Sequence, residues 1–195
     1  DGVVFGDNPA QGVTRGTTFL HPPLRLRVDF PNGWQVQNSP QQVLAVAPND
    51  GPVMLLQLVQ QQGAAVQDLA IAHMRAAGFR MVSGERTTIN GLDAHVGVFD
   101  GQVEGLGPVT SRAAHIVHGG RTYLLAGLAP PTTFMQVDAT FGAAIRTFRA
   151  LSADASGSAR QNSSPPCRQT TSLPRTDFIS TLPTQRKTIS PASWP

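Results

Sequence analysis

The sequence predicts an α+β fold, an antiparallel β-sheet with two packed α-helices. Short stretches of alternating apolar and polar residues recur along the first 151 positions, a pattern typical of half-buried strands. Asn-Gly and Gly-Gly pairs join several of these stretches and supply the positive φ angles that tight hairpins need. Two other segments carry apolar residues at helical spacing. Hairpin joints between strands favour an antiparallel sheet with helices on it.

The first clear strand covers residues 24–30, where every second side chain is apolar. Pro31 ends it because proline cannot donate a backbone hydrogen bond, and Gly33 helps to reverse the chain. Trp34 follows directly and is either a surface platform for a ligand or a core residue. The next residues include neither Arg nor Tyr, which favours a core position beside Phe30.

Turn residues predict the pairing of the later strands. A Pro-Asn-Asp-Gly turn separates two apolar runs, residues 43–47 and 53–59, and predicts a hairpin. Asn90 and Gly91 form the first joint of an antiparallel meander. Its four strands are expected at residues 80–89, 92–104, 109–118 and 121–129.

The two helices are marked by apolar stripes. The first covers residues 66–77 and ends at a glycine, which is common at helix C-termini. The second follows a Pro-Pro pair, and Thr132 or Thr133 is expected as its N-cap. Its stripe includes Phe141 and Phe148, which must lie on the sheet because several exposed phenylalanines would be unstable in water.

Composition divides the chain into three parts. Residues 1–22 are expected to be a lead-in segment, residues 23–151 the folded domain, and residues 152–195 a disordered tail rich in Ser, Thr and Pro. An out-of-frame translation would produce the same abrupt change, so both explanations of the tail stay open. Because the chain starts with Asp1-Gly2 and shows no signal sequence, we expect a processed product or part of a longer protein.

The net charge of +3 does not indicate nucleic-acid binding. Residues 1–150 hold ten Arg and ten Asp plus Glu, so the positive excess lies in the tail. The folded part shows no basic stripe interleaved with aromatic residues. No apolar run approaches the ~20 residues of a membrane span. We therefore expect neither a nucleic-acid partner nor a direct membrane span.

No sequence pattern indicates a catalytic, metal or cofactor site in this chain. It has no HExxH, no G-x-S-x-G and no carboxylate pair placed for acid–base chemistry. His115 and His118 should lie on opposite faces of a strand, and His73 is expected to be a hydrogen-bonded core residue. Cys167 is the single cysteine, which excludes a disulfide within the chain. The expectation is a chain that is not itself an enzyme.

An enzyme would require several histidines to converge with carboxylates in a pocket. The five candidates are His21, His73, His95, His115 and His118.

Several motifs of the first 152 residues occur together in one known family. The early ones are Asp1-Gly2, Phe5-Gly6, Pro9, Gly12, Phe19, His21-Pro22, Phe30-Pro31, Gly33-Trp34 and Asn38. The later ones are INGLDAH, GGRTYLLAGLA and TFGAAIRTFRALS. Together they resemble the C-terminal accessory region of bacterial zinc metallopeptidases of the CAAX prenyl protease/HtpX type. The resemblance implies a PsbP-like α/β sandwich.

The structural signature under this resemblance consists of Phe30, Pro31, Gly33, Trp34, Asn90, Gly91, Phe141 and Phe148. The family's zinc and HExxH belong to a catalytic domain that this sequence lacks, so no catalytic, metal or cofactor residue is transferred. After FRALS the family continues with a Gly-Asp-Thr turn in a LysM-like segment, which residues 153–195 do not match.

The function implied is a non-catalytic accessory domain of an envelope metalloprotease that recruits substrate or positions the enzyme. Its partner would be a protein or the protease catalytic domain, and its location the periplasm or cell envelope. The alternative is a free-standing PsbP-like periplasmic binding module that assists assembly of an envelope complex.

Overall fold

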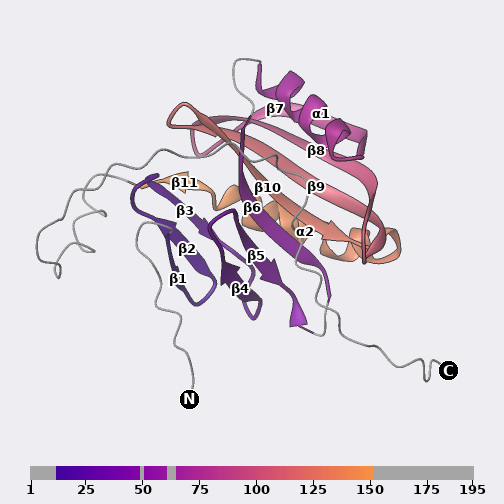
Figure 1. Ribbon diagram of the computed structural model, residues 1–195, viewed down its shortest axis with the longest axis horizontal. Helices are drawn as coiled ribbons and strands as arrows, with labels where there is room; N and C mark the ends of the chain where they lie inside the picture. The colour runs from indigo at the N-terminus through magenta and orange to yellow at the C-terminus, as the bar shows by residue number, and fades with distance from the viewer. Residues whose placement is uncertain (1–11, 49–50, 61–64, 152–195) are drawn as a thin grey trace, which may run out of the picture. The chain divides into compact units, whose positions relative to one another are not determined.

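The computed structural model of the protein describes residues 12–48, 51–60 and 65–151. These residues belong to one compact unit and form two antiparallel sheets and two helices (Figure 1). The expected α+β fold, with antiparallel strands and two packed helices, is confirmed. The tail expected at residues 152–195, including its single cysteine, lies outside the described residues.

The larger sheet has seven strands. They are β4 (Gln35–Asn38), β5 (Gln42–Val46), β6 (Val53–Val59), β7 (Arg80–Ile89), β8 (Leu92–Val103), β9 (Gly107–His118) and β10 (Arg121–Ala129). Their order across the sheet is β4-β5-β6-β10-β9-β8-β7. The antiparallel pairing confirms both the predicted β5–β6 hairpin and the predicted meander from β7 to β10. The crossover that places β10 beside β6 joins strands far apart in sequence.

The smaller sheet has four strands in the order β1-β2-β3-β11. They are β1 (Val13–Arg15), β2 (Thr18–His21), β3 (Leu26–Asp29) and β11 (Arg149–Ala150). The boundary expected after residue 22 falls in the turn between β2 and β3, which pair along the whole of β2. Part of the expected lead-in segment, residues 1–22, therefore belongs to the sheet. β1 and β11 are too short to show a period, so they are defined by their pairing with β2 and with β3, respectively.

The turn that begins at Pro31 connects the two sheets. β3 lies in the smaller sheet and β4 in the larger, so the turn does not close a hairpin. Gly33 has a φ of +81°, which favours glycine, and the Trp34 N–H donates to the Pro31 carbonyl at 3.3 Å. Pro31 thus ends β3 as expected, but the chain crosses to another layer instead of pairing back.

The two helices, α1 (Val66–Ala76) and α2 (Pro131–Arg146), lie on opposite faces of the larger sheet (Figure 1). Side chains of β9 show this directly. Arg112 forms a two-pronged ion pair with Asp138 of α2, whereas His115 contacts His73 of α1 from the other face. Within the described ranges, neither helix is both long and apolar enough to cross a bilayer.

The helix α1 ends where the sequence predicts. Gly78 has a φ of +82°, and its N–H donates to the Arg75 carbonyl. The Phe79 N–H donates to the Met74 carbonyl at 2.9 Å. This pair of hydrogen bonds is the Schellman motif, which glycine favours because it has no Cβ.

The expected N-cap of α2 is wrong. The N-cap position is Pro130, no side chain caps it, and Pro131 is already helical. Proline suits the first helical position because its φ is fixed near the helical value and its missing N–H would have no partner there. Thr132 and Thr133 therefore lie inside the first turn.

The main core lies between α2, the larger sheet and the smaller sheet. Phe141 of α2 is fully buried and lies against Gly127 of β10. A Cβ on Gly127 would lie 2.3 Å from ring atoms of Phe141. Glycine at this position therefore allows α2 to approach the sheet closely.

Gly127→Ala is expected to lower the free energy of unfolding by about 1–3 kcal/mol, because the added methyl overlaps the Phe141 ring. Gly142→Ala is the matched control, since its Cβ would meet no atom closer than 4.0 Å. Alanine in the middle of α2 should raise stability by about 0.5–1 kcal/mol. Urea unfolding of both variants measures the difference, and equal effects would contradict the close approach.

Candidate functional site

The aromatic residues of the expected signature lie in the core. Phe30, Phe141 and Phe148 are buried, and Phe148 lies just after Thr147, the C-cap of α2, instead of within the helix. Trp34 is partly buried, and its ring meets the edge of Phe141 at 6.3 Å between centroids. The indole therefore contributes packing, and it does not form a free platform for a ligand.

Asn90 and Gly91 form the turn between β7 and β8, with φ angles of +49° and +81°. The Asn90 side chain also forms two hydrogen bonds to a distant part of the chain. Its Nδ2 donates to the Arg146 carbonyl at 2.8 Å and to the Phe148 carbonyl at 2.7 Å. Asn90 therefore has two roles. Its backbone adopts the left-handed conformation of the turn, and its side chain donates to carbonyl groups at the C-terminal end of α2.

Three of the five histidines converge between α1 and the larger sheet. His95 and His115 are direct cross-strand partners on β8 and β9 and are almost completely buried. His73 reaches down from α1, and its Nδ1 lies 3.0 Å from His115 Nε2. His73 is therefore hydrogen-bonded, as expected, but it is only partly buried and not a core residue. Its partner comes from the sheet, where sequence spacing could not reveal it.

The pKa values of all three imidazoles are lowered. Burial, together with the nearby His73 and His95, lowers the pKa of His115 to about 3. Burial also lowers the pKa of His73 and of His95. Nδ1 of His95 and Nδ1 of His115 are buried without a hydrogen-bond partner in the structure.

This histidine cluster offers little chemistry by itself. The charged groups at its rim, Arg86 and Asp93, are bound to each other by two hydrogen bonds of 3.0 Å. No hydrogen bond joins a carboxylate to the three histidines among the described residues. In the same part of the chain, no group of three or more His, Cys, Asp or Glu side chains is arranged to hold a metal ion. The cluster acts as a polar layer beneath α1.

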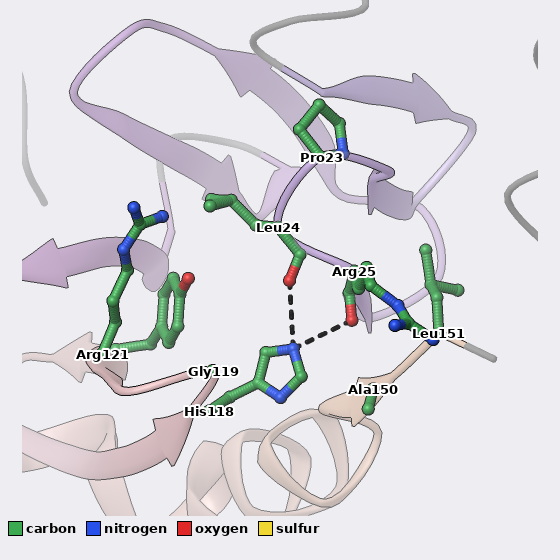
Figure 2. A pocket seen from close by; sticks show the side chains of 9 residues that line it. Pro23, Leu24, Arg25, His118, Gly119, Arg121, Ala150 and Leu151 are labelled. Atoms are coloured by element: carbon green, nitrogen blue, oxygen red, sulfur yellow. Dashed lines mark hydrogen bonds between the residues drawn. The ribbon is translucent and has the colours of Figure 1, made fainter. Parts of the chain in front are cut away.

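The other two histidines lie near a pocket of about 410 Å³ on the opposite side of the larger sheet. Figure 2 shows how three segments far apart in sequence form it. The lining residues are Pro23, Leu24, Arg25, His118, Gly119, Arg121, Tyr123, Ala150 and Leu151. They come from the β2–β3 turn, the β9–β10 turn with the start of β10, and the end of β11. This pocket is the candidate functional site.

His118 fixes the shape of the pocket. Its Nε2 lies 3.0 Å from both the Leu24 carbonyl and the Arg25 carbonyl (Figure 2). Both partners are acceptors, so Nε2 carries a proton and donates. The same ring meets Phe148 edge-on. His118 therefore joins the β2–β3 turn to the larger sheet, and it lies on the face opposite His115, as the strand period predicts.

Arg25 has an unusual backbone conformation. Its φ is +52°, a left-handed value that costs a residue with a Cβ about 1 kcal/mol. Hydrogen bonds hold this conformation on both sides of the residue. The Arg25 N–H donates to the Pro22 carbonyl at 3.0 Å, and the Arg25 carbonyl accepts from the Leu151 N–H at 2.8 Å.

The ionisable groups of the pocket are cationic or neutral. None of its nine lining residues carries a carboxylate. Among the described residues, neither Arg25 nor Arg121 takes part in an ion pair with a carboxylate. Burial raises the pKa of Tyr123, and a hydrogen bond from Arg121 opposes that rise. Burial lowers the pKa of nearby His21, and the charge of Arg121 acts in the same direction.

Sequence reasoning did not identify this pocket. It considered His21 and His118 as possible ligands but singled out neither arginine nor Tyr123. The chain's single tyrosine, two residues after Arg121, was a usable signal. The positive φ of Arg25 had no such signal, because arginine is not a residue that marks a turn.

Comparison with known proteins assigns the fold. No protein-family model matches the chain, and no curated protein sequence matches it. The solution structure of cyanobacterial PsbP from Synechocystis is similar, with a TM-score of 0.55 and 12% identity over 71% of this chain and 95% of that chain.

Two weaker likenesses have TM-scores below 0.5. LpqN of Mycobacterium tuberculosis, described as involved in cell envelope biogenesis, has a TM-score of 0.47 and 17% identity over 65% of this chain and 83% of that chain. A Pseudomonas aeruginosa protein of unknown function has a TM-score of 0.43 and 17% identity over 62% and 88%. The fold assignment depends on PsbP alone. The chain has a PsbP-like α+β fold.

Asn90→Gly should lower the free energy of unfolding by about 1–2 kcal/mol, because two hydrogen bonds to the end of α2 are lost while the turn stays relaxed. Asn90→Ala should lose about 1 kcal/mol more, since alanine must also adopt a positive φ. Chemical denaturation separates the two contributions. Equal losses in the two variants would rule out the backbone contribution.

Stability should fall on mild acidification because of the histidine cluster. The folded pKa of His115 is about 3 and the unfolded value is about 6.5, so the unfolded chain binds a proton that the folded chain excludes. The stability that comes from keeping His115 unprotonated is fully present above about pH 6.5 and decreases towards pH 3. It amounts to about 2 kcal/mol between about pH 7.5 and pH 5.

Urea unfolding at the two pH values measures this loss, and His115→Gln should reduce it. The lowered pKa values of His73 and His95 also make the folded state less stable as the pH falls. A free energy of unfolding that is flat over this range would contradict the burial of neutral imidazoles.

Proposed function

We propose that this chain is a non-catalytic accessory domain of a zinc metallopeptidase in the bacterial cell envelope. It would recruit substrate or position the enzyme. The proposal is supported by two points: the chain's motifs resemble that accessory region, and the chain has the PsbP-like fold that the resemblance implies. Its partner would be a protein substrate or the catalytic domain, and its location the periplasm or envelope.

The chemistry of the described residues supports a binding role. Asp29, Asp93, Asp100 and Asp138 are each bound to arginine, so these carboxylates are engaged in holding strands and helices together. Two of the converging histidines, His95 and His115, are buried beneath α1 and away from the pocket, and burial lowers the pKa of both. Acid–base catalysis needs a titrating group that substrate can reach, and histidines buried beneath α1 do not meet that need.

A second candidate is a free-standing PsbP-like module that assists assembly of an envelope complex. One observation favours it. The match covers 95% of the PsbP chain, so this fold makes up nearly the whole of that solved chain.

The DNA on both sides of this coding segment, translated in all frames, separates the two candidates. The accessory-domain proposal expects an HExxH reading frame in the same gene or in its neighbour. Its absence would overturn that proposal and favour the free-standing module. The same reading shows whether residues 152–195 are encoded in frame.

With the peptidase in hand, deletion of residues 12–151 tests the role directly. Cleavage of a protein substrate should fall by about tenfold or more, because a substrate held by an accessory domain has a higher effective concentration at the active site. Hydrolysis of a short peptide that reaches only the catalytic domain should be unchanged. Equal rates for the protein substrate with and without the domain would refute a recruiting role.

A further inference from the structure

We infer that the pocket beside His118 binds an organic anion, a carboxylate or phosphate group attached to an apolar body. Arg25 and Arg121, whose side chains Figure 2 shows on opposite sides of Leu24, line this pocket and would attract the anionic group. This inference concerns a ligand of the folded unit itself, and it does not depend on the proposed metallopeptidase partner.

The backbone at Arg25 is the first observation. At a φ of +52° in a hairpin loop, glycine or asparagine is the relaxed choice. Exposed arginines are common, but Arg25 occupies a backbone conformation that is unfavourable for any residue with a Cβ. Strained residues that the surrounding structure holds in place are concentrated at ligand sites.

The rigidity of this turn is the second observation. The Arg25 carbonyl accepts hydrogen bonds from His118 Nε2 and from the Leu151 N–H, and the Leu24 carbonyl accepts from the same His118 nitrogen. The turn is therefore fixed to the start of the β9–β10 loop and to the end of β11. A guanidinium on a fixed backbone loses less conformational freedom when it binds a ligand.

The positive charge of the pocket indicates that the ligand is an anion. Two exposed arginines, Arg25 and Arg121, are among the lining residues, and none of the lining residues carries a carboxylate. Arg121 lies beside the Tyr123 hydroxyl, which adds a neutral polar group at the same wall. Guanidinium forks match the paired oxygens of carboxylates and phosphates better than those of neutral groups.

The remaining walls indicate what the anion is attached to. Pro23, Leu24 and Leu151 line the pocket with apolar side chains. Its volume of about 410 Å³ lies within the range of small-molecule sites and exceeds the size of a bare inorganic ion. A compact organic anion can therefore place its charge at an arginine and its apolar part against these side chains.

Titration of the full 195-residue chain by ¹H–¹⁵N NMR tests the inference. The probes are benzoate and phenyl phosphate as the two anion types, benzyl alcohol as the neutral analogue, and inorganic phosphate as the anion without an apolar body. Benzoate or phenyl phosphate should cause saturable shifts at the amides of Arg25, Gly119 and Arg121, and comparison of the two identifies the preferred group. Benzyl alcohol and inorganic phosphate should bind at least about tenfold more weakly.

Variants separate the site from general charge effects. Arg25→Gly removes the guanidinium and relaxes the backbone, so affinity should fall about tenfold while the thermal midpoint is maintained or raised. Arg121→Gln should weaken binding similarly. Arg80→Gln is the control with the same loss of charge, because Arg80 lies on β7 and outside the pocket.

Three results would overturn the inference. The first is the absence of saturable shifts with both organic anions. The second is binding of benzyl alcohol as tightly as benzoate. The third is an equal loss of affinity in Arg80→Gln and Arg25→Gly.

Discussion

The contact between Phe141 and Gly127 sets how closely α2 packs on the larger sheet, and the main core is built around it. Because glycine has no Cβ, the ring can lie directly on β10 and bring α2 close to the larger sheet. Trp34 then meets the same ring from the segment that enters β4. α2 is thereby packed against both sheets, and the Phe-Pro-Asn-Gly-Trp turn can cross from one layer to the other.

Polar side chains hold the layers together where this core ends. Thr147 Oγ1 accepts from the Asp29 N–H, and the Asp29 carboxylate accepts from Thr18 and Arg27. Burial acts to raise the pKa of Asp29, but these hydrogen bonds and charges outweigh it and lower that pKa. His118 adds a further tie to the β2–β3 turn. The pocket lies where these ties bring separate turns together, which explains how a strained Arg25 backbone is tolerated.

The two faces of the larger sheet have different chemistry. Between α1 and the sheet, His95 and His115 are buried, and His115 is hydrogen-bonded to the partly buried His73. Stability is therefore expected to depend on pH. On the face of α2, His118 donates to backbone carbonyls at the border of a cationic pocket. The proposed binding site and the expected pH response therefore lie on opposite faces of the sheet, although His115 and His118 are three residues apart on β9.

Local signals in the sequence determined the local structure. Turn residues such as Asn90-Gly91 predicted the meander, and Gly78 predicted the end of α1, because a positive φ limits the choice of residue. The sheet to which β3 and β11 belong and the meeting of His73, His95 and His115 were decided only by the tertiary structure. The pocket also required it, since it joins residues nearly 130 positions apart. Cross-strand register and layer packing depend on contacts between distant segments, and periodicity within one segment does not specify its partners.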